Sequence, residues 1–287
     1  MLDRLGAGSR SAPRDALVAA SADEASRGKA FGLEGVGDNA GAFLGPLIAL
    51  ALLSFWGIAL RSIFYLAIIP GLFALLLVLL VRERPIAFAA KARIDVGVDH
   101  MPRLYRRYLA ATALFGLGNS SNAFLILQTQ ALGASLQTTI LIYAGFNLVA
   151  ALVSYPAGAL SDRLGRRNLL LLAFAIFIAT YLGFALATNL VLIATLFVLY
   201  GAYQGIFRAA GKALASDFVP ASLRAGGIGW YNATVGITGL IASIVAGLLW
   251  DRASHAALFL LGAGFAAAGG LALMLLVPNQ RPHASVA

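Results

Sequence analysis

The chain has 287 residues, is 60% hydrophobic and only 11% charged, and carries a formal net charge of +9 at pH 7. Soluble domains contain about 25% charged residues, so this composition excludes an ordinary soluble protein and favours a lipid bilayer as its surroundings. The positive charge lies in connecting segments rather than on one basic face, which argues against a nucleic-acid partner. The absence of Cys excludes disulfides and thiolate metal sites.

Hydropathy along the chain predicts an all-α integral membrane protein. A spanning helix needs roughly 20 apolar residues, and eight stretches approach that length. They are residues 28–54, 62–81, 107–130, 138–158, 168–187, 190–216, 226–250 and 256–277. The sequence therefore predicts about eight transmembrane helices.

The first span contains two acidic residues, Glu34 and Asp38. Because a helix rises 1.5 Å per residue, Asp38 lies about 16 Å from Arg27, near the middle of the bilayer. Acidic side chains inside a membrane are costly and mark ion or proton paths. We therefore take Asp38 as a candidate for proton coupling, with Glu34, nearer the cytoplasm, more structural. The alternative for Asp38 is a structural acid paired with an arginine from helices outside this chain.

The same span continues with a Gly-x-x-x-Gly-Pro run. Gly41 and Gly45 are predicted to let another helix pack closely. Pro46 is predicted to bend the helix.

The third span is interrupted near its middle by the run Gly-Leu-Gly-Asn-Ser-Ser-Asn, residues 116–122. Glycines and clustered amides inside a span predict a broken helix that lines a substrate cavity. The candidate cavity residues are Asn119, Asn122, Tyr143, Asn147, Tyr200, Tyr203, Gln204 and Asn232. The alternative, expected for about half of them, is hydrogen bonding between helices worth about 0.6 kcal/mol each. The second half shows no evident charged binding pair, which favours a neutral, amphipathic or cationic substrate.

A charged run between the fourth and fifth spans carries the most specific signal. Residues 158–167 read Gly-Ala-Leu-Ser-Asp-Arg-Leu-Gly-Arg-Arg. This run resembles the loop signature G-x-L-[SA]-D-R-x-G-R-R of the major facilitator superfamily, whose members are transporters built from two six-helix halves. The resemblance implies a secondary active transporter that works by alternating access. Its implied partners are the bilayer, a small-molecule substrate and a coupling proton or cation.

The resemblance also implies a cytoplasmic gating motif. In the family, the Asp of this loop lies against the N-terminus of a helix from the other half, where unpaired N–H groups and the helix dipole favour a carboxylate. Here that contact would join Asp162 to the start of the first span, near residues 27–30. Gly158 and Gly165 would permit a tight turn and the close approach of backbones. Three arginines, Arg163, Arg166 and Arg167, would hold the anionic inner leaflet and pair with Asp162 or nearby acids. The alternative is a loop held only by lipid head groups.

An internal repeat relates two parts of the chain. A shift of 197 residues places Arg27 on Arg224 and Gly32 on Gly229. Together with the resemblance, it implies a partial fold whose first half begins roughly 93 residues before Met1. The implied organisation is a remnant of the N-terminal helix bundle at 1–81, a cytoplasmic linker at 82–106, a complete six-helix bundle at 107–278 and a cytoplasmic tail at 279–287.

Two further motifs resemble those of the family. The run from Arg4 to Gly8 matches an R-x-x-x-G pattern of the fourth helix, which adds Arg4 to the coupling candidates. The Gly-x-x-x-Gly-Pro run resembles part of an antiporter motif in the fifth helix, although Leu47–Leu50 replace the glycines that follow it in the family. Antiport is therefore suggested. The partial fold leaves open a non-transporting fragment or scaffold, or a function that depends on oligomerisation.

Basic residues set the expected orientation. Of the 21 Lys and Arg residues, only Arg61 and Arg252 fall outside the segments expected on the cytoplasmic side, in agreement with the positive-inside rule. The abundance of Arg, Ala and Gly suggests a bacterial inner membrane. The sequence contains no phosphate-binding glycine loop, nucleophile elbow or His cluster. No catalytic residue, metal or cofactor is therefore predicted, and an enzyme is disfavoured.

Overall fold

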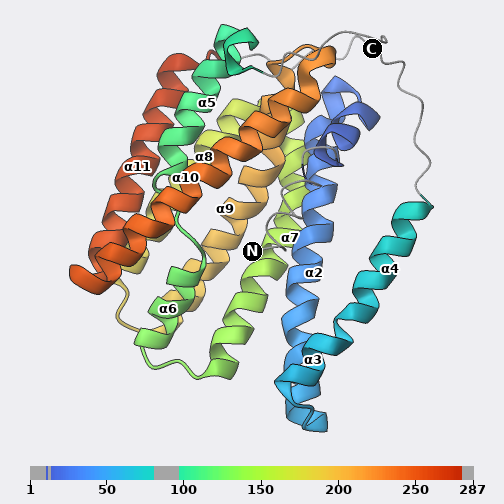
Figure 1. Ribbon diagram of the computed structural model, residues 1–287. Helices are drawn as coiled ribbons and strands as arrows, with labels where there is room; N and C mark the ends of the chain where they lie inside the picture. Colours follow the sequence, from blue (N-terminus) through green and yellow to red (C-terminus); the bar gives the residue numbers. More distant parts are fainter. Residues whose placement is uncertain (1–10, 12–13, 81–96, 280–287) are drawn as a thin grey trace.

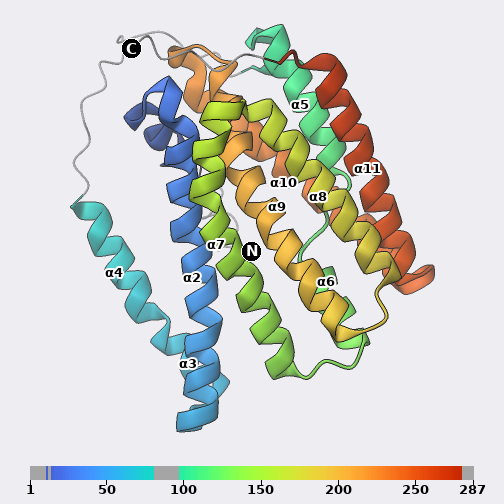
Figure 2. The same ribbon diagram turned by 180° about the vertical axis from the view of Figure 1, so that it is seen from behind.

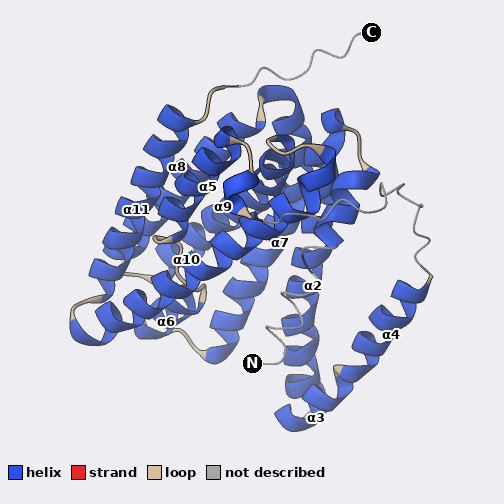
Figure 3. Cartoon of the chain, turned by 45° about the horizontal axis from the view of Figure 1, so that its top comes forward, coloured by secondary structure: helices blue, strands red, loops and turns tan. Residues whose placement is uncertain are grey.

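The computed structural model describes residues 11, 14–80 and 97–279, and within these ranges it contains helices and no strands (Figure 3). The longer helices are α2 (Arg27–Trp56), α3 (Leu60–Leu66), α4 (Ile68–Leu79), α5 (Arg103–Gly116), α6 (Ala123–Ala131), α7 (Leu136–Leu164), α8 (Arg166–Leu186), α9 (Leu190–Asp217), α10 (Arg224–Arg252) and α11 (His255–Leu276). Residues 14–21 are also helical, and short 3₁₀ turns precede three helices: η1 (Glu24–Ser26), η2 (Val98–His100) and η3 (Ala221–Leu223).

Six of the described helices are long and apolar enough to cross a membrane. They are α2, α7, α8, α9, α10 and α11, with η1 and η3 counted as extensions of α2 and α10. The expected all-α membrane fold is confirmed.

Two expected spans are each divided into two helices. The second span is divided into α3 and α4 at Ala67. Pro70 has no N–H to donate to the carbonyl of Leu66, so the helical ladder is interrupted there. The third span is divided into α5 and α6 by residues 117–122, which confirms the predicted break.

The third span also begins earlier than predicted. Helix α5 begins at Arg103, directly after Pro102, so the last residues assigned to the linker are helical. Proline is favoured at a helix start because the missing N–H would be unpaired there. Buried Tyr105 and Tyr108 alternate with exposed arginines along this first part of the helix and give it a strong amphipathic pattern. Residues 81–96, which make up most of the predicted linker, lie outside the described ranges.

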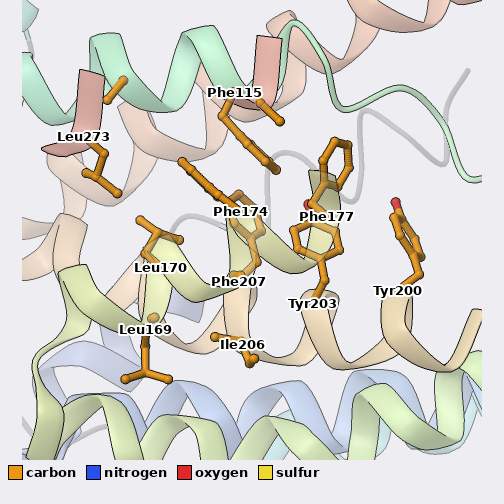
Figure 4. Packing of buried hydrophobic residues seen from close by; sticks show 14 of the residues in the cluster. Phe115, Leu169, Leu170, Phe174, Phe177, Tyr200, Tyr203, Ile206, Phe207 and Leu273 are labelled. Carbon is orange, nitrogen blue, oxygen red and sulfur yellow. The ribbon is translucent and has the colours of Figure 1, made fainter. Parts of the chain in front are cut away.

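Helices α5 and α7–α11 pack around one aromatic core (Figures 1 and 2). Phe115 of α5 stacks on Phe174 of α8, with ring centroids 3.9 Å apart, and both rings lie beside Phe207 of α9 (Figure 4). Such rings bury large apolar areas and add specific edge and face contacts. The core holds these helices in one bundle, which we call the C-terminal bundle.

Helix α2 is attached to this bundle through α7, beside which it runs in both views (Figures 1 and 2). Gly28, Gly32 and Gly35 face α7, where an added Cβ would meet atoms of Gly158 or Ser154. Because close helix approach needs small residues, these three glycines account for the tight contact.

The predicted packing role of Gly41 and Gly45 finds no partner among the described residues and stays a prediction. A Cβ at either position would meet no atom within 4 Å among the described residues. At 100° per residue, Gly41 and Gly45 are turned well away from the helix face that carries Gly28 and Gly32. The sequence pattern indicates small residues but not the side of the helix on which the neighbour lies. Pro46 lies inside α2, which continues to Trp56.

The predicted repeat has a structural counterpart. The 197-residue shift carries η1 onto η3 and the first residue of α2, Arg27, onto the first residue of α10, Arg224. It also carries the helical segment 14–21 onto the last turns of α9. Segments related by the repeat therefore share the same order of helix, 3₁₀ turn and helix.

Candidate functional site

The contact between the N-terminal helices (residues 14–21 and α2) and the C-terminal bundle brings together charged residues that lie far apart in sequence. Where α2 begins, both carboxylate oxygens of Asp162 accept hydrogen bonds from backbone N–H groups, from Gly28 N at 2.9 Å and from Lys29 N at 3.0 Å. These N–H groups belong to the first turn of α2, where no intrahelical acceptor is available. The predicted contact between Asp162 and the start of the first span is present.

A second carboxylate, Asp217 at the end of α9, extends this contact. It accepts a hydrogen bond from Arg27 of α2 at 2.9 Å and pairs closely with Arg166 of α8. Arg166 also binds Asp162 at 3.0 Å and donates to the carbonyl oxygen of Glu24. Sequence reasoning missed Asp217 because the loop signature ends at the arginines and does not name their distant partner.

The other residues of the motif have separate contacts. Gly165 has a φ of 93°, a conformation that favours glycine, and it joins α7 to α8. Arg167 donates to the carbonyl oxygens of Leu273 and Met274 at the end of α11, and not to an acid as predicted. This arrangement is favourable because a cation complements the negative end of a helix dipole. Arg163 is exposed.

An apolar layer lies deeper between the two parts. Ala19 and Phe31 from the N-terminal helices pack against Ala213 of α9 and Ile228 of α10, and all four are fully buried. The layer lies about one turn deeper along α2 than the Asp162 contact. It therefore separates that contact from the middle of the membrane.

Below this layer lies an ion-pair cluster of three acids and three bases. Its members are Arg14 and Asp15, Glu34 and Asp38 of α2, and Arg208 and Lys212 of α9. Lys212 pairs with Asp15 at 3.0 Å and with Glu34 at 3.1 Å, and Asn232 donates to Asp15 at 3.0 Å. Asp38 pairs with both Arg14 and Arg208.

The cluster corrects two expectations. Arg208 and Lys212, expected in a cytoplasmic segment, lie within α9 and face the acids of α2. The second half therefore does carry charged groups directed toward the contact with the N-terminal helices. Asn232, expected in the cavity group, binds Asp15 in the cluster. Arg4 lies outside the described residues.

The cluster has a buried part and an exposed rim. The side chains of Asp15, Glu34 and Lys212 are 0%, 8% and 10% exposed, whereas those of Asp38, Arg14 and Arg208 are 38%, 39% and 27% exposed. Asp15, Glu34 and Lys212 are thus shielded, whereas the rim, formed by Arg14, Asp38 and Arg208, is partly exposed.

The amides at the helix break are held by buried tyrosines. Asn119 donates to the hydroxyl of Tyr203 at 3.1 Å, and the hydroxyl of Tyr200 donates to Asn122 at 2.8 Å. Tyr181 of α8, which sequence reasoning missed, lies 3.3 Å from Ser120. The structure brings four of the predicted cavity residues together, as interhelical hydrogen-bond partners.

Three predicted cavity residues lie apart from these hydrogen bonds. Asn147 donates to the carbonyl oxygen of Tyr143 in its own helix, and Gln204 is half-buried on α9. Among the residues that the structure places, no group of three or more His, Cys, Asp or Glu is arranged to hold a metal ion.

Comparison with known proteins covers nearly the whole chain. The sequence model described as Major Facilitator Superfamily matches residues 1–104 and 108–287. An uncharacterized MFS-type transporter, MJ1317 of Methanocaldococcus jannaschii, is 32% identical over 281 residues, which are 96% of this chain and 70% of that protein. The uncharacterized protein Rv2265 of Mycobacterium tuberculosis is 25% identical over 259 residues, 87% of this chain and 63% of that protein.

The fold also matches a solved structure. The human organic anion transporter MFSD10 (TETRAN) superposes with a TM-score of 0.71 over 91% of this chain and 66% of that protein. The two sequences are 15% identical, so this likeness concerns the fold alone.

Proposed function

The chain belongs to the Major Facilitator Superfamily of membrane transporters, and on this premise we propose that it is a secondary active transporter of a small molecule that works by alternating access. The observation that carries the proposal is the pair of hydrogen bonds from the start of α2 to Asp162. They join the N-terminal helices to the C-terminal bundle at the Asp162 end of α7. A transporter of this kind needs such a contact to close one side and to break when that side opens.

We assign Asp162 the role of a latch on the cytoplasmic side. Its charge is stabilised by two N–H groups and by Arg166, and Asp217 and Arg27 support the same contact. Charge-assisted hydrogen bonds of this kind are roughly twice as strong as neutral ones. The uncharged amide introduced by Asp162→Asn would therefore shift the population toward the open arrangement.

The latch is tested by labelling a cysteine placed beneath it, because the chain contains no Cys of its own. Ala213→Cys puts a thiol in the apolar layer, where Ala213 is fully buried. A shift of about 1.4 kcal/mol toward the open state is expected to make maleimide labelling about tenfold faster when Asp162→Asn is added. The control is Ala173→Cys, buried in α8 of the C-terminal bundle, where labelling stays slow in both backgrounds.

Equal labelling of Ala213→Cys with and without Asp162→Asn contradicts the latch. It would favour the alternative of a static scaffold, since a fragment that does not alternate has no open state for the substitution to populate.

We further propose that Asp38 carries the coupling proton. Two arginines stabilise its charged form in the arrangement seen here, and one of them, Arg208, lies on α9 of the C-terminal bundle, which separates from α2 when the contact opens. Opening therefore favours proton uptake, and closing favours release. Glu34 would support this role, and Arg4 remains a proposed participant.

Infrared difference spectra of the lipid-embedded protein test the proton on Asp38. Acidification from about pH 7 to about pH 3 spans the range in which carboxyl groups take up protons. We expect a protonated-carboxyl band that Asp38→Asn removes and that Asp251→Asn, at the exposed end of α10, leaves in place. A band that is the same in all three proteins would refute the coupling role.

A bacterial inner membrane, with the Asp162 end of the helices in the cytoplasm, fits the distribution of Lys and Arg and is part of the proposal. We also keep the Asn119–Tyr203 and Asn122–Tyr200 pairs as proposed cavity residues, since polar groups that hold one another when buried are available to a ligand if the helices separate.

A further inference from the structure

We propose that Arg14 and Arg208 bind the carboxylate of an anionic substrate, and that this carboxylate takes the place of Asp38 between them. The inference rests on the proposed proton-coupled transport and extends it by naming the substrate class. Three features of the rim lead to it: its depth in the membrane, its charge and its geometry.

Depth comes first. Asp38 is eleven residues beyond Arg27 along α2, about 16 Å at the rise of an α-helix. Asp38 and Arg208 are nevertheless partly exposed. Charged groups at such a depth face water or a polar partner, because exposure to hydrocarbon is costly. The rim therefore borders a part of the protein that a hydrophilic ligand can reach.

The net charge of the ion-pair cluster indicates that the ligand is an anion. The cluster pairs three acids with three bases and is neutral while Asp38 is ionised. A proton on Asp38 leaves the cluster with one excess positive charge, located on the two guanidinium groups of the rim. A monovalent anion restores neutrality, and an uncompensated charge at this depth is strongly unfavourable.

The arrangement of the two arginines indicates that the anionic group of the ligand is a carboxylate. Asp38 presents one oxygen to each arginine, with Oδ1 lying 3.4 Å from Arg14 and Oδ2 pairing closely with Arg208. Guanidinium groups match the two oxygens of a carboxylate, so a ligand carboxylate can occupy the same donors. Farther along the same side of α2, a Cβ on Gly41 or Gly45 would meet no described atom within 4 Å. The described part of the chain therefore leaves these two positions open beside the rim.

A cationic ligand fits less well. A cation that paired with Asp38 would break the ion pairs of Asp38 with both arginines. The two guanidinium groups would then be unpaired, which is costly in a partly buried site. We therefore propose an anionic substrate in place of the neutral, amphipathic or cationic one that the sequence favoured. The sequence interpretation differed because it did not recognise Arg208 as part of the site.

Binding is accompanied by uptake of one proton. The ligand carboxylate pairs with Arg14 and Arg208, the carboxylate of Asp38 leaves them, and a proton from water then binds Asp38. Other titratable or charged groups of the cluster are Arg14 and Asp15 of the 14–21 segment, Glu34 of α2, and Arg208 and Lys212 of α9, and Tyr231 of α10 lies near Asp15 and Arg208. The acid of α7, Asp162, lies at the far end of that helix. Asp15 and Glu34 keep Lys212 as a partner throughout, so Asp38 is the group that takes the proton.

The test measures proton uptake by the purified full chain in weakly buffered detergent at about pH 7, where benzoate is ionised. The probe is benzoate, and benzamide is its uncharged counterpart. We expect benzoate to bind with uptake of about one proton per protein, and its affinity to fall by up to about tenfold per pH unit as the pH rises. Benzamide is expected to cause neither effect.

Three variants separate the role of each residue. Asp38→Asn is expected to bind benzoate with no proton uptake and with an affinity that is the same at about pH 6 and about pH 8. Asp38→Asn combined with Arg208→Gln removes the rim pair without leaving either charge alone, and is expected to lose benzoate binding. Arg252→Gln, which removes an exposed positive charge at the far end of α10, is the matched control and is expected to behave like the native chain.

The outcomes distinguish this proposal from the one on which it rests. Benzoate binding that survives in the Asp38→Asn/Arg208→Gln double variant, or benzylammonium binding in place of benzoate, overturns the anion site even if Asp38 titrates in the infrared experiment. Benzoate binding that needs Arg208 but takes up no proton in the native chain supports the anion site and refutes proton coupling.

Discussion

Gly28 and Gly158 mark the point where α2 and α7 approach most closely. A Cβ on either residue would overlap the carbonyl oxygen of the other. The contact positions the first turn of α2 so that its N–H groups reach Asp162. The absence of two side chains is therefore as important to the latch as the presence of the carboxylate.

Gly158→Ala is predicted to weaken the closed arrangement. The added methyl group must displace the backbone of α2, and overpacking of this kind costs about 1–3 kcal/mol. The expected results are a lower melting temperature in detergent and faster labelling of Ala213→Cys. Gly41→Ala is the matched control, because its methyl group would enter open space and helix propensity favours Ala over Gly. Equal effects of the two substitutions would show that the close approach has no energetic role.

The two glycine pairs show what sequence can reveal about single residues. The loop signature identified Gly158 and Asp162 because a known pattern fixes both the residue types and their spacing. No such pattern fixed the rotation of α2, so the Gly-x-x-x-Gly run at Gly41 was taken for the packing face. The face that packs carries Gly28 and Gly32. Rotation depends on partners elsewhere in the chain, which local spacing does not contain.

At the scale of elements, the break between α5 and α6 is stabilised rather than loose. Asn119, Ser120 and Asn122 each reach the hydroxyl of a different buried tyrosine on α8 or α9. Gly118 lies against the backbone of Gly262 in α11, so the chain passes close to that helix at the break. These contacts satisfy polar groups that a continuous helix would have paired internally.

Tyr203→Phe is predicted to destabilise the protein modestly. It removes the hydroxyl that accepts from Asn119 and leaves the ring of Tyr203 in the aromatic core. Hydrogen bonds between membrane helices are worth about 0.6 kcal/mol on average, and a part-buried amide left unpaired raises the loss to about 1–2 kcal/mol.

The measurement is thermal unfolding in detergent, with Tyr155→Phe as the control. Tyr155 is 46% exposed, so removal of its hydroxyl leaves no buried partner unsatisfied. No difference between the two variants would mean that Asn119 finds another partner and that the tyrosine does not hold the break.

The break itself was predictable, but its partners were not. Two glycines and four polar residues within residues 116–122 indicated that a helix would not continue there. Tyr200 and Tyr203 were singled out as polar groups inside the predicted span 190–216. Tyr181 was missed because a single tyrosine in α8 looks like any other aromatic residue in a core, and only the fold brings it to Ser120.

At the scale of the whole molecule, the contact between the N-terminal helices and the C-terminal bundle has three successive layers: the Asp162 contact, the apolar layer and the ion-pair cluster. Helices α3 and α4 lie beside α2 and away from the C-terminal bundle (Figures 1 and 2). Hydropathy predicted the helices of both parts, but it missed the cluster that joins them because Arg208 and Lys212 near the end of a span resemble interfacial anchors.

The pair formed by Asp15 and Lys212 links the two parts at the deepest of these layers. The 197-residue repeat carries Asp15 onto Lys212, so the acid and the base occupy equivalent positions in the two related segments. Asp15 is fully buried and Lys212 nearly so. This pair can therefore be tested as a unit that holds the parts together.

Lys212→Met is predicted to destabilise the protein strongly, by about 3–5 kcal/mol, because it leaves the buried Asp15 without its ammonium partner. Asp15→Asn combined with Lys212→Met removes both charges and keeps a hydrogen-bonding group beside Asn232. The double variant is expected to recover much of the lost stability, since replacing both partners of a buried pair is far less costly than removing one. Melting temperatures of the native chain, both single variants and the double variant complete the cycle. Additive losses would show that Asp15 and Lys212 act independently, and Glu34, the other partner of Lys212, would then be the group that anchors α9 to α2.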